Sequence, residues 1–263
     1  MSLHLLYHLL RRRIKNSESR EGFVADFCSI CRRFRPFQLM ETGTTTTVAG
    51  IKTNQQVMGH YMKCGTCGSS FSTRDINYIY VAQEPPTDLE ILIETTHPGL
   101  RTAYAGRQEM ERELKTGTTT FSAEERRKLI LEPIIGLSYM MDRRLAETGR
   151  VDMPTLAAGI CTICGAAIIG SYADKPHLSN AAQHLTFIIM GIEIVLGIIF
   201  SLLLWRGAPA RFARTQIAPR LARALKPLRP ERIELEDCLA DCDQHHLQIG
   251  RLIKADWILS KIQ

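Results

Sequence analysis

Apolar residues are distributed unevenly along the chain, and the longest apolar stretch comes late in the sequence. Residues 186–205, TFIIMGIEIVLGIIFSLLLW, contain a single charged residue, Glu193. At 1.5 Å per residue, a helix of this length spans about 30 Å, which is the hydrocarbon thickness of a bilayer. Trp205 and Arg206 end the stretch with residues that favour the membrane–water interface. We therefore predict a transmembrane helix here.

A shorter apolar stretch precedes it at residues 155–170 and corresponds to only about 24 Å of helix. Residues 151–154 and 171–172 bring it close to a full span, and the short distance to the next stretch suits a hairpin. Small residues recur at every fourth position, a pattern that lets membrane helices approach closely. They are Ala158, Thr162, Ala166 and Gly170. We predict a two-span hairpin over residues 151–206, with a re-entrant first segment as the alternative.

Basic residues flank the predicted hairpin on both outer sides. Arg143, Arg144 and Arg150 precede it, and eight lysines and arginines follow from Arg206 to Arg232. The connecting SYADKPHLSNAAQH holds one lysine and one aspartate. Because loops rich in lysine and arginine stay on the cytoplasmic side, we expect a multi-pass membrane protein with both termini in the cytoplasm.

The chain before the hairpin divides into a β-rich region and a helical region. RRFRPFQLMET, QQVMGHYMKC and DINYIYVA are rich in aromatic and β-branched residues and predict short strands within residues 21–84. ETGTTTTVAG, at residues 41–50, suits a hairpin turn or loop. Residues 85–150 then predict a helical connector.

The connector carries several helix signals. Ser122 and Glu125 form a capping box, and Gly117 is a helix stop. Glu111 and Lys115 are spaced as an i,i+4 ion pair. Pro133 cannot donate a backbone hydrogen bond, so a kink or break is expected there. One face of that helix is apolar, at Ile130, Ile134, Leu137, Met141 and Leu145.

Both ends of the chain also predict helices. Residues 1–20 predict a basic amphipathic helix that lies on a membrane or packs against the neighbouring domain. Its apolar positions are Leu3, Leu6, Leu10 and Ile14. Residues 207–263 predict a helical tail that is first basic and then acidic.

The basic part of this tail favours anionic lipid headgroups as its partner. It places apolar residues at helical spacing, which suits a helix lying in the membrane interface beside its positive charges. These residues are Phe212, Ile217, Leu221 and Leu225. Nucleic acid is the competing partner on charge alone.

Composition and the N-terminal sequence indicate whether the eight cysteines are reduced or form disulfides. The chain has 263 residues and a formal net charge of +6. A disulfide scaffold is normally a short secreted chain with a signal peptide. MSLHLLYHLLRRRIK places its charges after the apolar run, the reverse of a signal peptide. We therefore expect reduced thiols.

Two cysteine pairs in the β-rich region have the spacing of a metal site. Zinc takes four soft ligands in a tetrahedron, and two tight turns that each present two thiolates supply them. The sequences are CSIC at 28–31 and CGTCG at 64–68, and they resemble the zinc-ribbon family over about 60 of the 263 residues.

The resemblance implies a small antiparallel sheet with metal knuckles at one end. By it, the Zn²⁺ ligands are Cys28, Cys31, Cys64 and Cys67. Arg32 stands where a glycine is common, so the first knuckle is expected to be looser. Two disulfides, or a rubredoxin-type iron site, are the alternatives.

A third pair, Cys161 and Cys164, lies inside the first predicted span. On a helix their Cβ atoms are about 5–6 Å apart, whereas a disulfide needs about 3.8 Å. We interpret this pair as packing residues beside the small-residue stripe. Glu193 lies at a similar depth on the second span and should be protonated or paired, with Thr162 as its hydrogen-bond partner. A proton relay, a metal site and polar contacts in a homo-oligomer are the options, and we favour the last.

A fourth group lies in the tail sequence DCLADCDQHH. Cys238 and Cys242 fall on one helical face with His245 or His246. Three soft ligands on one face could hold a second metal ion. A half-buried helix face explains the same spacing and is the interpretation we favour.

The combined pattern predicts an α+β protein: a zinc ribbon at 21–84, a helical connector at 85–150, a hairpin at 151–206 and a helical tail. No P-loop, Rossmann glycine pattern, nucleophile elbow or HExxH motif is present, which argues against an enzyme. We predict a membrane-anchored binding or scaffolding module whose ribbon docks a protein or, as the less favoured partner, nucleic acid on the cytoplasmic side. The alternative is a membrane redox or transport component that uses Cys161, Cys164 and Glu193.

Overall fold

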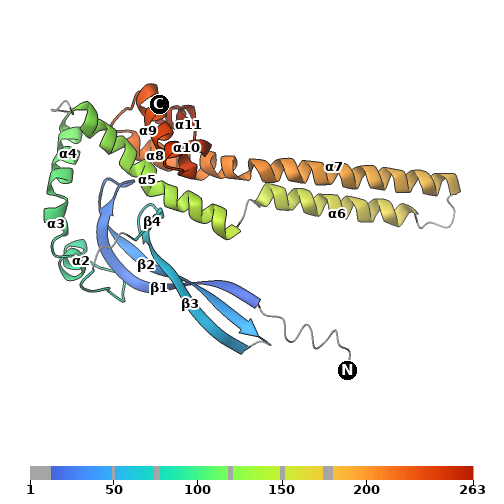
Figure 1. Ribbon diagram of the computed structural model, residues 1–263, viewed down its shortest axis with the longest axis horizontal. Helices are drawn as coiled ribbons and strands as arrows, with labels where there is room; N and C mark the ends of the chain where they lie inside the picture. The colour runs from blue at the N-terminus through green and yellow to red at the C-terminus, as the bar shows by residue number, and fades with distance from the viewer. Residues whose placement is uncertain are drawn as a thin grey trace. The chain divides into compact units, whose positions relative to one another are not determined.

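The computed structural model describes residues 13–48, 51–73, 78–117, 121–148, 152–173 and 180–262 (Figure 1). The chain divides into two compact units, Met1–Met140 with Pro219–Gln263, and Met141–Ala218. The described residues form an antiparallel sheet followed by helices, which confirms the predicted α+β class.

The first unit begins with a four-stranded antiparallel sheet in the order β1-β2-β3-β4. The strands are β1 (Arg13–Cys28), β2 (Arg33–Val48), β3 (Ile51–Cys64) and β4 (Ser70–Ser72). Phe27 of β1 pairs with Phe34 of β2, and Phe37 of β2 pairs with Cys64 of β3. This register brings the β1–β2 turn and the β3–β4 turn to the same end of the sheet.

The long strands correct two predictions. Arg13 to Arg20 pair with Thr47 to Met40 of β2, so a helix over residues 1–20 is wrong for this part, while residues 1–12 lie outside the described residues. The predicted turn at 41–50 is also wrong up to Val48, because β2 continues through its threonines. Threonine is β-branched and favours a strand when partners exist on both sides, as β1 and β3 provide here.

Of the predicted strand at 75–82, the described part, residues 78–82, forms only an isolated β-bridge. Residues 74–77 lie outside the described chain, and Ala82 makes an isolated bridge with Phe23 through hydrogen bonds of 2.7 and 2.9 Å. Gly22 permits this contact, since a Cβ atom on it would lie 2.4 Å from the Ala82 carbonyl oxygen. The segment therefore fixes the bulged part of β1.

The sheet shares its hydrophobic core with the first connector helices, α2 (Leu89–Thr96) and α3 (Leu100–Ala103). Leu92, Ile93 and Leu100 pack with the aromatic face of β1 and β2. The Thr96 hydroxyl accepts a hydrogen bond of 3.1 Å from the Ala25 backbone N–H. The ribbon core consequently extends beyond residue 84, the predicted boundary.

The remaining connector helices follow their sequence signals closely. Helix α4 (Ala105–Thr116) ends at Gly117, whose φ of 67° is left-handed. Helix α5 (Ala123–Thr148) begins with the predicted capping box, in which Ser122 and Glu125 exchange hydrogen bonds. It continues through Pro133, so of the predicted kink or break, the break is absent. Its apolar face is buried at Ile130, Ile134, Leu137 and Met141.

The second unit contains the two apolar helices, α6 (Met153–Ala173) and α7 (Asn180–Phe212), which lie side by side (Figure 1). Both are long and apolar enough to cross a membrane. Their side chains are widely exposed, with Ile163 at 71% and Leu203 at 61%. Apolar surface of this extent marks a membrane or interaction surface.

The tail is helical, as predicted. A π-helical turn, η1 (Ala213–Ile217), follows α7 and leads into α8 (Ala218–Leu225). Helices α9 (Arg232–Gln244), α10 (Gln248–Leu252) and α11 (Ala255–Ile262) then pack together. Gly250 allows α10 to approach α9, since its Cβ atom would lie 2.5 Å from the Leu239 carbonyl oxygen.

Candidate metal centre

Two turns at one end of the sheet have the same backbone conformation. In the β1–β2 turn, the Arg32 N–H donates to the Cys28 carbonyl at 2.7 Å. In the β3–β4 turn, the Gly68 N–H donates to the Cys64 carbonyl at 3.0 Å. Arg32 and Gly68 are both left-handed, with φ of 55° and 67°. Each turn thus directs its two cysteine side chains to the same side.

The four ribbon cysteines converge on one point. Their Sγ atoms all lie within 4.8 Å of one another, with 3.7 Å between Cys28 and Cys67 and 4.0 Å between Cys31 and Cys64. A tetrahedral metal with bonds of about 2.3 Å to sulfur requires sulfur–sulfur distances of about 3.8 Å. A disulfide requires about 2.05 Å, and all four cysteines are free. The predicted residues therefore form a site that fits a metal ion.

The four thiols are close enough to shift one another's pKa values. Hydrogen bonding between the thiols of Cys28 and Cys31 raises the pKa of Cys28 and lowers the pKa of Cys31 to about 7. The Cys31 N–H lies 3.4 Å from Cys28 Sγ and can donate to a thiolate there. Four thiolates at these distances repel one another, so their joint ionisation requires a bound metal.

Arg32 reaches the left-handed conformation because its side chain is fixed. Its Nε donates to Glu111 at 2.7 Å and its Nη1 donates to the Ala224 carbonyl at 2.9 Å. The Arg32 and Glu111 side chains are only 8% and 9% exposed. These bonds offset a left-handed strain of about 1–3 kcal/mol for a non-glycine residue. The expectation of a looser first knuckle is wrong, since Arg32 adopts the conformation of Gly68.

Glu111 is a residue whose role the sequence did not reveal. The predicted partner Lys115 is exposed, and Glu111 instead pairs with Arg32 and, at 3.0 Å, with Arg107. Arg107 also pairs with Glu132 of α5 at 3.0 Å. This buried network connects the first knuckle to two helices. Charge and helical spacing alone could not single out a partner in a distant turn.

The small-residue stripe of α6 faces α7, as predicted. A Cβ atom on Gly197 would lie 2.2 Å from Thr162 Oγ1, and one on Gly165 would lie 2.6 Å from Glu193 Oε1. The two backbones therefore approach closely because glycine lacks a side chain there. The stripe residues are half-buried along this contact, at Ala158, Thr162, Ala166 and Gly170.

Cys161 and Cys164 are exposed and lie on the surface of α6, outside this contact. The Thr162 hydroxyl donates to the Ala158 carbonyl at 2.9 Å, so the predicted bond from Thr162 to Glu193 is absent. Glu193 Oε2 is buried and has no hydrogen-bond partner within the described chain. The two cysteines therefore do not join Glu193 and Thr162 in one polar site.

The tail cluster separates into buried and exposed members. Cys238 and Cys242 are buried on α9, and this desolvation raises the pKa of Cys242 to about 11. His245 and His246 are exposed because α9 ends at Gln244 and the chain then turns. Within the described ranges, these residues do not form a group of converging metal ligands. The arrangement matches the helix-face interpretation.

The basic tail differs from its predicted form in its apolar stripe. Ile217, Leu221 and Leu225 are fully buried within the protein, so they cannot enter a membrane interface. Arg206, Arg214 and several later basic residues stay exposed. Contact with anionic headgroups consequently remains a prediction that depends on charge alone.

Glu21, Glu41 and His60 form a second group with converging ligand atoms. They come from three strands, and His60 Nε2 lies 3.1 Å from Glu21 Oε1. The register that pairs Glu41 with His60 creates this group, and no sequence spacing indicates it. The group is solvent-accessible, and surface carboxylates often gather without a metal, so we assign no site here.

Comparison with known proteins adds no family assignment: no family model, curated protein or solved structure is significantly similar to the chain. The candidate metal centre is therefore defined by its own geometry. Its strongest feature is the tetrahedral spacing of four sulfur atoms from two matching turns.

Proposed function

We propose that this chain is a membrane-anchored zinc-ribbon protein that binds or scaffolds a protein partner on the cytoplasmic side. The observation that carries the proposal is a cluster of four cysteines that fits a metal ion, on the same chain as two helices long and apolar enough to cross a membrane. A site with four thiolate ligands leaves no open coordination position, which is typical of structural rather than catalytic zinc.

The membrane orientation follows from charge. Basic residues flank the outer ends of α6 and α7, and the segment between them is nearly neutral. By the positive-inside rule both termini, and with them the ribbon, are cytoplasmic. A reducing compartment would keep the four thiols available for zinc.

The ribbon carries exposed side chains suited to a protein partner. Ile79 and Tyr80 are 76% and 55% exposed. The Ile79 N–H donates to the Thr96 carbonyl at 3.1 Å, which anchors this exposed pair to the covered side of the sheet. Aromatic and aliphatic residues of this kind are enriched at the cores of protein interfaces.

The redox or transport alternative has less support. Cys161 and Cys164 are exposed on α6, whereas Glu193 of α7 lies at the contact with α6. A relay or redox site requires its groups to converge, and these do not. Glu193 is better explained as a polar residue that pairs across an oligomer contact within the bilayer.

The metal is tested with the purified full-length protein in detergent. We expect one zinc ion per chain, no iron–thiolate absorption, and loss of zinc in Cys64→Ser/Cys67→Ser. The matched control is Cys161→Ser/Cys164→Ser, which should keep its zinc. An iron-coloured protein, or equal zinc in both double variants, would contradict the proposal.

Topology and partner binding are tested separately. Reporter fusions at both ends should be active only on the cytoplasmic side, and a cysteine introduced at Asn180 should react with an external reagent. A partner recovered from solubilised membranes should be lost with Ile79→Ser/Tyr80→Ser while zinc content is unchanged. Termini on opposite sides would show that α6 does not span the bilayer.

A further inference from the structure

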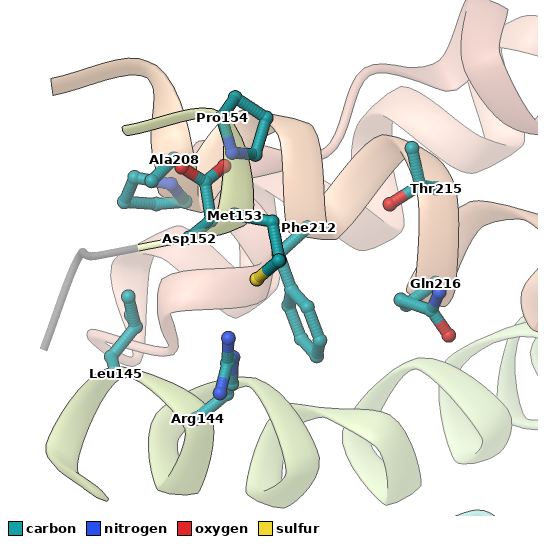
Figure 2. A pocket seen from close by; sticks show the side chains of 10 residues that line it. Arg144, Leu145, Asp152, Met153, Pro154, Ala208, Phe212, Thr215 and Gln216 are labelled. Carbon is teal, nitrogen blue, oxygen red and sulfur yellow. The ribbon is translucent and has the colours of Figure 1, made fainter. Parts of the chain in front are cut away.

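Polar groups of the cavity where α5, α6 and α7 meet are engaged within the protein (Figure 2). Arg211 donates to both carboxylate oxygens of Asp152 at 2.8 and 2.9 Å, and these bonds hold the pKa of Asp152 well below its usual range. The Thr215 hydroxyl donates to the Arg211 carbonyl at 2.8 Å. The Arg144 guanidinium lies 5.7 Å from the centre of the Phe212 ring. We assign no ligand to this cavity.

A pocket of about 300 Å³ in the first unit differs, because several of its polar groups have no partner. It lies between the β1–β2 turn and one face of α4. The turn and the adjoining strand ends contribute Phe27, Arg32, Arg33 and Phe34, and α4 contributes Gln108, Glu111, Arg112 and Lys115. Gln108, Arg112 and Lys115 are spaced i, i+4 and i+7, so they share one face of the helix.

Four cations and one carboxylate line this pocket, and two of the cations are uncompensated. The carboxylate, Glu111, is paired with Arg32 at 2.7 Å. Arg112 is paired with a neighbouring carboxylate of α4 at 2.8 Å. Arg33 and Lys115 are exposed and form no ion pair with any residue that the structure describes. The pocket therefore has two positive charges available for a ligand.

Two buried nitrogen atoms of the lining residues lack a hydrogen-bond acceptor within the described part of the chain. They are Nη2 of Arg32 and Nε2 of Gln108. The Arg32 side chain is only 8% exposed and is held in place, because its Nε donates to Glu111 and its Nη1 donates to the Ala224 carbonyl. A buried donor without an acceptor costs free energy, so these groups favour a ligand that brings acceptor atoms.

We propose that this pocket binds a phosphate monoester. Such a group carries a charge of about −1.5 to −2 at pH 7 and three acceptor oxygens, which match two uncompensated cations and the unpartnered donors. Arginine is well suited to bidentate binding of phosphate. Phe27 and Phe34 add apolar lining for the carbon atoms to which the phosphate is bonded. The proposal depends on this pocket alone and requires neither the membrane insertion nor the protein partner proposed above.

The phosphate monoester can come from a phosphorylated side chain of a protein or from a small phosphorylated metabolite. Both sources present the same group to Arg33 and Lys115, so the structure assigns the group and the experiment assigns the source. The probes are a short fluorescent peptide with one phosphoserine, the same peptide with unmodified serine, and glycerol 3-phosphate.

The charge requirement is tested by fluorescence anisotropy with the full-length protein in detergent. The phosphorylated peptide should bind at least about tenfold more tightly than the unmodified one, as one charge-assisted hydrogen bond provides. Arg33→Gln/Lys115→Gln should remove this preference. The matched control is Arg229→Gln/Lys261→Gln, which removes the same charges from exposed residues outside the pocket and should keep it. Equal losses in the two double variants would show diffuse surface charge and overturn the site.

The unpartnered amide is tested without changing any charge. Gln108→Met keeps the length of the side chain but removes its N–H donors, and it should weaken binding of the phosphorylated peptide severalfold. Gln83→Met is the control, because Gln83 is exposed and lies outside the pocket. Zinc content and thermal unfolding of both variants show that the fold is kept. Unchanged binding in Gln108→Met would contradict the site and leave only surface attraction.

Competition with glycerol 3-phosphate identifies the source. Displacement of the peptide at a concentration close to the peptide's own Kd would support a site for small phosphate monoesters. Weak displacement, with the peptide's preference for phosphate intact, would support a phosphorylated protein segment. Failure of both phosphorylated probes to bind would overturn the inference. If the same protein still contained zinc and remained in membranes, the proposed function would be unaffected.

Discussion

The Cys-x-x-Cys spacing occurs in two regions of this molecule with opposite results. In the ribbon, two such pairs bring four sulfur atoms within 4.8 Å of one another. In α6, Cys161 and Cys164 stay exposed, and within the part of the chain that the structure describes they do not join a group of converging ligands. The difference comes from the backbone. A left-handed residue after each ribbon pair closes a turn, while the α6 pair remains on a continuous helix.

The surroundings reinforce this difference. Thiolates in the ribbon would be compensated by the proposed metal ion and by backbone N–H groups, such as that of Cys31, which lies 3.4 Å from Cys28 Sγ. A thiolate in a bilayer has no such compensation, so cysteine there remains neutral and behaves as a small apolar residue. On the proposed function, the ribbon would therefore depend on a metal ion as well as on its buried Arg32–Glu111 pair. The hairpin depends on close packing of small residues.

Removing the metal should cause the largest loss of folding stability, and this loss should be confined to the ribbon. Structural zinc supplies folding free energy of about 10 kcal/mol in small domains. A strong chelator, or Cys64→Ser, should abolish amide hydrogen-exchange protection around Phe23–Phe37 in the full-length protein. Protection along α6 and α7 should persist. Equal hydrogen-exchange protection of the ribbon with and without metal would contradict the proposal that the ribbon, unlike the hairpin, needs a metal to fold.

The full-length chain is needed for this measurement. Leu92, Ile93 and Leu100 complete the ribbon core, so a fragment that ends at residue 84 lacks part of it. Such a fragment would lose stability for reasons unrelated to zinc.

The buried pair at the first knuckle should give the next largest effect. Glu111→Gln leaves the Arg32 guanidinium buried beside a neutral group, which costs about 3–5 kcal/mol for a buried pair. The matched control is Glu109→Gln on the same helix, whose exposed pair with Arg112 should contribute less than about 1 kcal/mol. Chemical denaturation of the zinc-loaded protein measures both.

Arg32→Gly sharpens this test. Glycine adopts the left-handed turn without strain, and it also removes the buried cation. The cost of Glu111→Gln should therefore be smaller in the Arg32→Gly background. Additive costs would show that Glu111 stabilises the protein independently of the knuckle.

Local patterns predicted the parts of this protein that depend on local spacing. The ribbon ligands lie in two short turns, and the capping box at Ser122 and the stop at Gly117 each involve a few residues. The hairpin followed from composition and from a four-residue repeat. Each cysteine turn, the capping box and the helix stop therefore depend on only a few neighbouring residues, and each hairpin helix depends on the composition of its own segment.

The features that the sequence did not predict depend on contacts between residues far apart in the chain. Arg32 and Glu111 are 79 positions apart, and Asp152 and Arg211 are 59 apart. The threonines of β2 have two strand partners, which outweighed a turn-like composition. Helix α9 ended before His245, so extending its periodicity placed both histidines on the wrong face. Register and helix ends are tertiary outcomes, and a short pattern does not contain them.

Substitution of Gly197 should cause a smaller loss of stability, confined to the hairpin. In Gly197→Leu the new side chain collides with Thr162, since even a Cβ atom would lie 2.2 Å from its hydroxyl oxygen. Overpacking of this kind costs about 1–3 kcal/mol. Thermal unfolding in detergent should show the loss, with zinc content unchanged. Gly191→Leu is the control on the open side of α7. Equal stability of the two variants would contradict the close contact.

Substitution of Cys161 and Cys164 in α6 should have the smallest effect on stability. Cys161→Ala/Cys164→Ala replaces two exposed small residues by another small residue, so thermal stability in detergent should change by less than about 0.5 kcal/mol. Zinc content should match the unmodified protein, in contrast to any ribbon cysteine variant. If this variant lost zinc, or an absorption band of a cofactor, the pair would bind a metal ion or cofactor even though its helical backbone does not bring it together with further ligands. In that case the two regions would share one chemistry, and the spacing rather than the backbone would decide the role of the motif.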